Sequence, residues 1–129
     1  MKLRESARPT LPPLKEREVV RQVKDFLQWR GWRPIRMQRT IIPGAFQTAE
    51  SGCPDYLFLR YETGNYDRTG AALALWIEFK RPGGPMRAGQ AEWHERERIR
   101  GAAVWVVEEL DDFMTLYNQH FEYLHPKRK

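Results

Sequence analysis

The sequence predicts an α/β fold in which helices flank a mixed central sheet. Three observations predict it: helical periodicity near the amino end, apolar strand-like runs in the middle, and a short β-branched run between two further helical segments. The expected order is helix, three strands, helix, strand, helix. A chain of 129 residues, 41% of them hydrophobic, suffices for one domain with one modest core.

The two ends of the chain differ in composition from its centre. Residues 1–14 contain three prolines and mixed charges without apolar periodicity, which predicts a flexible arm. A single folded domain is expected over residues 15–125. Residues 126–129 read Pro-Lys-Arg-Lys and form a short basic tail.

The first helix is predicted from residue 15 by apolar side chains at helical spacing, and Gly31 ends it. This stripe consists of Val19, Val20, Val23, Phe26 and Leu27. Residues 32–42 alternate loosely among arginines, which predicts a strand that Pro43 breaks. Residues 44–54 lack periodicity and are expected to form a loop.

Two strands are predicted over residues 55–61 and 71–80. The connection between them contains Gly64-Asn65 and Asp67, which is typical of a hairpin, so the strands should be antiparallel neighbours. A proline and glycine turn follows over residues 81–85.

The last three elements are a helix, a strand and a helix. Residues 86–100 are helix-compatible, with Ala91, Trp93 and Ile99 available for packing, and Gly101 stops this helix. Residues 102–107 are apolar and β-branched, which predicts a strand buried on both faces. Residues 111–121 are expected to form the closing helix.

The most informative polar residues are Asp55, Glu78 and Lys80. Side chains alternate between the faces of a strand, so Glu78 and Lys80 project to one side while the apolar residues between them project to the other. If the strand that begins at Asp55 lies alongside, two carboxylates converge beside an ammonium. Such a group can hold a hard divalent cation and a polarised water.

Charge and cysteine content narrow the possible partners and compartments. The 22 Lys and Arg residues exceed the 17 Asp and Glu residues, for a formal net charge of +5, which favours polyanionic partners such as nucleic acid. A single cysteine excludes an internal disulfide and fits a reducing, intracellular compartment. The apolar runs fall far short of the ~20 residues of a membrane span, so no membrane partner is expected.

Each of these features also has a plain structural interpretation. Asp55 could cap a turn, and Glu78 with Lys80 could form an ion pair on an edge strand. The histidines share no metal-ligand spacing, which indicates surface or packing positions. The tryptophans favour core or dimer contacts over base stacking; they are Trp29, Trp32, Trp76, Trp93 and Trp105.

The segments around these residues resemble the virus-type replication-repair nuclease (VRR-NUC) domain of the PD-(D/E)XK nuclease superfamily. The resemblance spans about residues 15–107, and it is carried by Gly-Cys-Pro-Asp at 52–55, Ile-Glu-Phe-Lys-Arg-Pro-Gly-Gly at 77–84, and Gln90 in the next helix. It implies a restriction-endonuclease-like core and magnesium-dependent DNA cleavage, with manganese able to substitute. Free-standing members resemble Holliday-junction resolvases and act as homodimers, which implies a bacterial or phage-type cytoplasmic protein.

The resemblance also implies roles for individual residues. Asp55, Glu78 and the backbone carbonyl of Phe79 would hold the metal, and Lys80 would orient or deprotonate the attacking water. Gln90 would reach the metal-bound water or a substrate phosphate. Its alternative interpretation is an exposed helix glutamine.

The family commonly places another acid on the first helix, where this chain offers Glu16 and Glu18. Glu16 lies three, four and seven residues before Val19, Val20 and Val23, on the inward stripe, whereas Glu18 aligns with the polar face. We therefore favour Glu16. Its alternative role is a first-turn acid that the helix dipole stabilises.

Several arginines are candidates for gripping DNA phosphates. They include Arg36 and Arg39, and Arg81 and Arg87 lie nearer the expected chemistry. The alternative is a solvated charged face. Phosphate contacts carry affinity without base information, which fits an enzyme that reads DNA shape.

The sequence thus favours a metal-dependent endodeoxyribonuclease that cuts branched or otherwise structured DNA as a homodimer. Two alternatives stay open: a sequence-specific restriction-type nuclease of the same fold, and a nuclease-like module that binds DNA without cutting it.

Overall fold

The structure, a computed structural model, describes residues 15–37, 50–62 and 70–124. Its elements follow the expected order: α1 (Glu16–Trp29), β1 (Arg33–Arg36), β2 (Tyr56–Tyr61), β3 (Ala72–Phe79), α2 (Ala88–Ile99), β4 (Ala103–Val107) and α3 (Leu110–Phe121). The proposed amino-terminal arm and basic tail lie outside the described residues. Within those ranges, no helix combines the length and the apolar character that crossing a bilayer requires.

The four strands form one mixed sheet in the order β1-β2-β3-β4. The pairs β1–β2 and β2–β3 are antiparallel, whereas β4 runs parallel to β3. The helix α2 makes the crossover that a parallel pair needs. β3 is therefore an inner strand, so Glu78 and Lys80 do not form the edge-strand ion pair of the plain interpretation. The first strand is shorter than expected: it ends at Arg36, and residues 38–42 lie outside the described residues.

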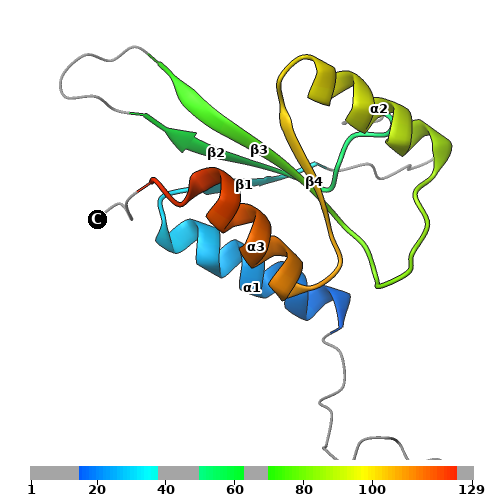
Figure 1. Cartoon of the computed structure of the whole chain (residues 1–129), viewed down its shortest axis with the longest axis horizontal. Coiled ribbons are helices and arrows are strands. Elements are labelled where there is room, and N and C mark those ends of the chain that lie inside the picture. Colours follow the sequence, from blue (N-terminus) through cyan, green and yellow to red (C-terminus); the bar gives the residue numbers. More distant parts are fainter. Residues whose placement is uncertain (1–14, 38–49, 63–69, 125–129) are drawn as a thin grey trace, which may run out of the picture.

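The main core lies between the sheet and the helices α1 and α3, which run side by side across one face (Figure 1). The stripe predicted for α1 supplies Val19, Val23 and Leu27, all buried. Phe113 of α3 is 0% exposed and stacks edge-on against Phe26 at 5.4 Å between ring centroids. Burial of such rings contributes a large share of a small domain's stability.

A second, smaller cluster lies on the opposite face under α2 and is built from Cys53, Trp93 and Val104. Trp93 packs edge-on against Trp76 of β3, with centroids 4.9 Å apart. The expected packing of Ala91 and Ile99 was wrong: both are exposed, Ile99 by 76%, because α2 touches the sheet along one narrow stripe. Trp29 is 78% exposed at the end of α1, so it is not a core residue.

The last strand, β4, is the edge strand of the sheet. Val104 is buried in the cluster under α2, whereas Trp105 and Val107 are buried in the main core on the other face. The expectation of a strand buried on both faces is therefore confirmed, and Val106 is only half-buried.

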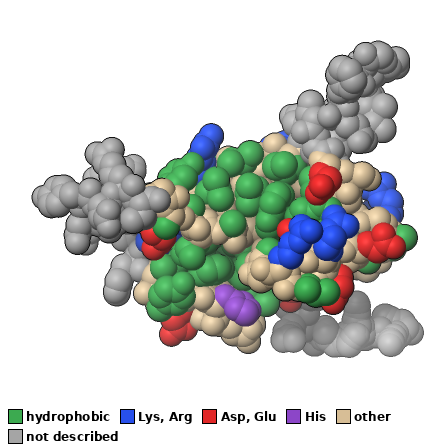
Figure 2. Space-filling view, turned by 90° about the horizontal axis from the view of Figure 1, so that it is seen from above, with side chains coloured by type: hydrophobic (Ala, Val, Ile, Leu, Met, Phe, Trp, Pro, Cys, Tyr) green, Lys and Arg blue, Asp and Glu red, His purple; other side chains and the backbone are tan. Residues whose placement is uncertain are grey.

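Part of the sheet on the α2 side is not covered by any helix of the described residues. The register places Ile35 opposite Leu57 and Ala74 opposite Leu59, so these four side chains share a face beyond the reach of α2. Ala74 is exposed and the other three are half-buried. We call Ile35, Leu57, Leu59 and Ala74 the apolar strip. Figure 2, seen from this side, shows a continuous hydrophobic area beside a group of charged side chains.

The main core predicts that truncating a buried aromatic residue lowers the free energy of unfolding far more than truncating an exposed one. Phe113→Ala should lower the free energy of unfolding by about 3–5 kcal/mol, because it opens a cavity at the centre of the aromatic cluster. Urea unfolding would measure it. Trp29→Ala is the control and should change stability by less than about 0.5 kcal/mol. Equal losses in the two variants would contradict this account of the core.

Candidate active site

A tight turn before β2 sets the position of Asp55. Gly52 has a φ of +88°, and a Cβ atom there would lie 2.6 Å from the carbonyl oxygen of Gly89, at the start of α2. Only glycine allows both the backbone conformation and this close approach. The Phe79 N–H donates to Asp55 Oδ2 at 3.0 Å, and the Met37 N–H donates to the Asp55 carbonyl at 2.8 Å. Asp55 is thereby fixed at the end of the sheet, beside β3.

The pairing of β2 with β3 brings the two predicted acids together. Tyr56 lies opposite Ile77, and the same register continued by one residue places Asp55 opposite Glu78. Residues directly opposite each other in an antiparallel pair have neighbouring side chains on the same face. The two carboxylates thus come from adjacent strands, as the sequence predicted.

Glu78, Lys80 and Gln90 form a connected polar network under α2. Glu78 is 3% exposed, and its Oε2 accepts a hydrogen bond from Gln90 Nε2 at 3.0 Å. The same carboxylate oxygen lies 3.5 Å from Lys80 Nζ. Lys80 Nζ in turn donates to Gln90 Oε1 at 3.0 Å. A buried carboxylate is costly unless it is paired and hydrogen-bonded, and this network supplies both.

Gln90 is 2% exposed, so the alternative interpretation as an exposed helix glutamine is wrong. Its Oε1 also accepts the N–H of Arg87 at 3.0 Å, which satisfies one of the free donors at the start of α2. The amide side chain therefore ties the helix start to both charged groups of β3.

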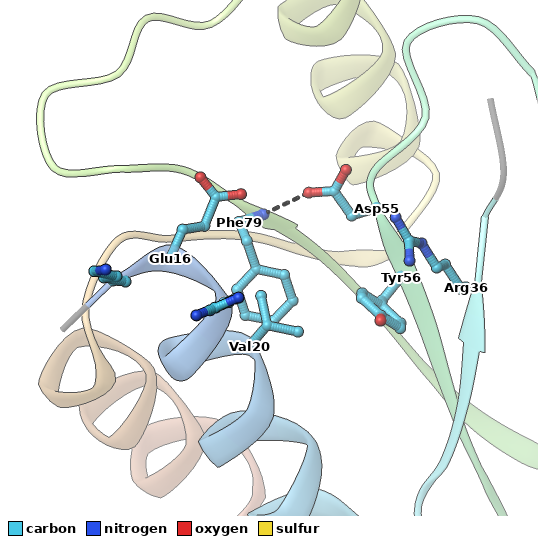
Figure 3. A pocket seen from close by; sticks show the side chains of 8 residues that line it. Glu16, Val20, Arg36, Asp55, Tyr56 and Phe79 are labelled. Atoms are coloured by element: carbon cyan, nitrogen blue, oxygen red, sulfur yellow. Dashed lines mark hydrogen bonds between the residues drawn. The ribbon is translucent and has the colours of Figure 1, made fainter. Parts of the chain in front are cut away.

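The two acids at the start of α1 lie in different surroundings. Glu16 lines an open pocket of about 510 Å³ together with Asp55 and Phe79, and in Figure 3 its carboxylate reaches toward them. Glu18 instead accepts from Arg21 Nη2 at 2.7 Å, and this guanidinium lowers the pKa of the Glu18 carboxyl. The helical spacing therefore favoured Glu16, which is the acid that borders this pocket.

The donor atoms here fit a hard divalent cation, because carboxylate and carbonyl oxygens are the ligands that Mg²⁺ prefers. Asp55 and Glu78 are the two acids on adjacent strands, with the backbone of Phe79 between Glu78 and Lys80. In the described ranges, no three His, Cys, Asp or Glu side chains lie close enough together to hold a metal ion. Glu16 thus borders the pocket without joining a three-acid cluster.

The arginines proposed for DNA binding fall at two places around these acids. Arg36 ends β1 and lines the same pocket as Asp55. Arg81 and Arg87 are exposed and lie at the two ends of the turn between Lys80 and α2. Arg39 lies outside the described residues.

Sequence reasoning missed three residues near this site. Lys15 and Arg17 line the pocket beside Glu16, and their positions before and within the first turn of α1 were the available signal. His94 follows Gln90 by one helical turn and is 1% exposed, although nothing in its sequence context distinguishes it from a surface histidine. Within the described chain, neither ring nitrogen of His94 has a hydrogen-bond partner.

Comparisons with known proteins support the fold. No protein-family model matches the sequence, and no curated protein matches it either. One solved structure, described as a VRR_NUC domain, is similar with a TM-score of 0.56 and 23% sequence identity. The likeness covers 82% of this chain and 96% of that one. The chain therefore has the restriction-endonuclease-like α/β fold of that domain.

The burial of His94 predicts a pH dependence of stability. Burial, reinforced by Arg98 and Lys80, lowers the pKa of His94 from 6.5 to about 4. The unfolded chain then binds a proton at a higher pH than the native state, so stability falls as the pH drops from 6.5 toward 4. Between pH 7.5 and pH 5.0 this histidine should account for a loss of about 2 kcal/mol in urea unfolding.

A matched pair of variants isolates the effect. His94→Phe should remove this pH-dependent loss, because the ring no longer titrates. His120→Gln replaces an exposed histidine and should keep it. An unchanged pH dependence in His94→Phe would rule out the buried imidazole as its source.

Proposed function

We propose that this protein is a magnesium-dependent endodeoxyribonuclease that hydrolyses phosphodiester bonds of branched DNA, in the manner of a Holliday-junction resolvase. The observation that carries the proposal is that Asp55 accepts the Phe79 N–H at the end of β3, between the Glu78 and Lys80 of the polar network that Gln90 completes. The fold shared with a VRR_NUC domain supports it independently. The basic net charge of +5 agrees with a polyanionic substrate.

Each residue has a role that its position supports. Asp55, Glu78 and the Phe79 carbonyl are the proposed ligands of the cation. When bound, Mg²⁺ would neutralise charge on the phosphate and make a coordinated water a better nucleophile. Lys80 lies beside Glu78, where its ammonium can orient the attacking water or stabilise charge that gathers on the phosphoryl oxygens. Gln90 holds Lys80 at this place through its own hydrogen bond.

Hydrolysis needs one water and releases two strand ends. The water oxygen bonds to phosphorus, one bridging P–O bond breaks, and the departing oxygen takes up a proton. Lys80 is only 15% exposed, so its ammonium acts in a partly dehydrated setting where electrostatic interactions are strong. Glu16, across the pocket from Asp55, is placed to hold a further water through its carboxylate.

The apolar strip supports a homodimer. Monomers rarely leave a continuous apolar patch uncovered, and a patch on the open face of a sheet can pair with its own copy about a two-fold axis. A symmetric pair of active sites is also what cutting two strands of a junction requires. The proposed occupant of the strip is therefore a second copy of this chain.

Cleavage assays on junction, flap and linear duplexes test the activity. Wild-type protein with magnesium should nick the junction preferentially, and chelator should abolish the nicking. Asp55→Asn and Glu78→Gln should each lower the rate by a factor of about 10³, because each removes a charged ligand. Asp112→Asn, an exposed acid on α3, is the matched control and should cut at the wild-type rate.

Other outcomes of these assays identify the alternatives. Cutting at one recurring sequence in all three substrates would indicate a restriction-type nuclease, and retention without products would indicate a binding module. A melting temperature that manganese raises in wild type but not in Asp55→Asn would support the metal site independently of cleavage.

The dimer is tested through the apolar strip. Light scattering should give a mass of two chains for wild type and about 15.4 kDa for Leu59→Glu, because a carboxylate within the strip opposes its burial. Ile99→Glu changes an apolar residue that is 76% exposed on α2, away from the strip, and should keep the dimer. A monomeric wild type, or a dimeric Leu59→Glu, would overturn the assignment.

A further inference from the structure

The pocket beside Asp55 is lined by cationic side chains as well as by its two acids. Three cationic residues, Lys15, Arg17 and Arg36, line it together with Glu16 and Asp55. They come from opposite sides: the first two from the start of α1, and Arg36 from the end of β1. Figure 3 shows Arg36 beside Asp55 on the strand side, with the start of α1 facing them. We call Lys15, Arg17 and Arg36 the cationic rim.

The rim cations differ from Arg21 of α1 in how their charge is matched. Outside the pocket, Arg21 lies 2.7 Å from Glu18 and 3.5 Å from Asp25, so its charge is matched within the helix. In contrast, no residue of the cationic rim forms an ion pair with another part of the described chain. The two arginines of the rim retain the donor geometry that binds phosphate oxygens in pairs.

The acids of the pocket oppose the binding of an anionic ligand, and the rim offsets this effect. Glu16 and Asp55 would repel a phosphodiester, and three cations outnumber these two acids. The alternation of Lys15, Glu16 and Arg17 in the sequence places a cation on each side of the acid. The rim therefore lowers the repulsion that these acids exert on an oxyanion, in addition to what a cation held by Asp55 would do.

We propose that the cationic rim is a seat for a backbone phosphate of the strand being cut, next to the phosphate under attack. The cut strand then passes through the pocket between the start of α1 and the end of β1. Lys15 and Arg17 are the new assignments, as positioning residues that hold the strand and take no part in bond breaking. The inference rests on the proposed nuclease function for the identity of the ligand.

The seat is separate from the cations that follow Lys80 in the chain. Arg81 and Arg87 do not line this pocket, so they offer a second set of phosphate contacts. A strand held by both sets would be fixed at two places. The second set of contacts would add to the affinity for the strand and so lower KM. Because the contacts are to phosphates, their effect should be the same for every base sequence.

DNA binding measured without cleavage tests the seat directly. All proteins carry Asp55→Asn so that no strand is cut, and fluorescence anisotropy of a labelled DNA junction gives Kd over a range of salt concentrations. Replacing Lys15 and Arg17 with alanine should weaken binding about tenfold or more at low salt. It should also reduce the slope of log Kd against log salt by about 0.7 to 0.9 for each phosphate that the variant no longer binds.

The matched control removes the same kind of charge from the same helix. Arg21→Ala lies outside the pocket and should leave both Kd and the salt slope unchanged within about twofold. In the otherwise wild-type protein, Arg17→Ala should raise KM and leave kcat nearly unchanged, whereas Arg17→Lys should restore part of the loss. Circular dichroism of each variant confirms that α1 is intact.

The results separate failure of the seat from failure of the nuclease. The seat is wrong if wild type cuts DNA but the Lys15 and Arg17 variants bind DNA as tightly as Arg21→Ala does. It is also wrong if Asp55→Asn does not bind DNA. If wild type does not cut but binding depends on Lys15 and Arg17, the seat stands and the nuclease proposal fails. A fall in kcat without a change in Kd would also overturn the seat, because positioning would then not be the role of these residues.

Discussion

The register between β2 and β3 is the constraint on which the site depends. Side chains alternate with a period of two, so a slip of one residue would turn Glu78 and Lys80 toward α1 and α3. That slip is opposed by the core, since Phe58, Leu75 and Ile77 are all 0% exposed against those helices. The apolar face of the sheet therefore fixes which residues reach the polar face. The chemistry of the site is specified by packing on the other side of the same strands.

The order of the elements could be predicted from the sequence because it rests on local patterns. The helical spacing of apolar side chains predicted α1, and the apolar run before Lys80 predicted β3. The same spacing separated Glu16 from Glu18, since the direction of a helical side chain follows from its position in the stripe. Local patterns do not specify which strand lies at an edge or where a helix end projects. The expectation that Ala91 and Ile99 pack against the sheet was wrong for this reason.

The contacts that complete the site are long-range, and this is why the sequence did not predict them. The pocket joins Lys15 and Arg17 on the first helix to Asp55 before the second strand. His94 looks like any histidine of a charged helix, yet it is buried because α2 lies flat on β3 and β4 with Trp93 and His94 beneath it. Burial of this ring follows from how the helix docks, and docking depends on the whole sheet.

The chemistry of Gln90 explains why an amide occupies the centre of the network. Its Oε1 accepts from Lys80 while its Nε2 donates to Glu78, so one neutral side chain satisfies a cation and an anion together. A glutamate at this position would lack the donor and would add a second negative charge beside Glu78. A leucine would leave both charged groups without this partner in a buried setting, which is costly. Because the same Oε1 also accepts the N–H of Arg87, movement of α2 would disturb the acid and the ammonium at once. The helix and the charged pair are therefore held as a single unit, which gives the proposed active site its geometry before any substrate binds.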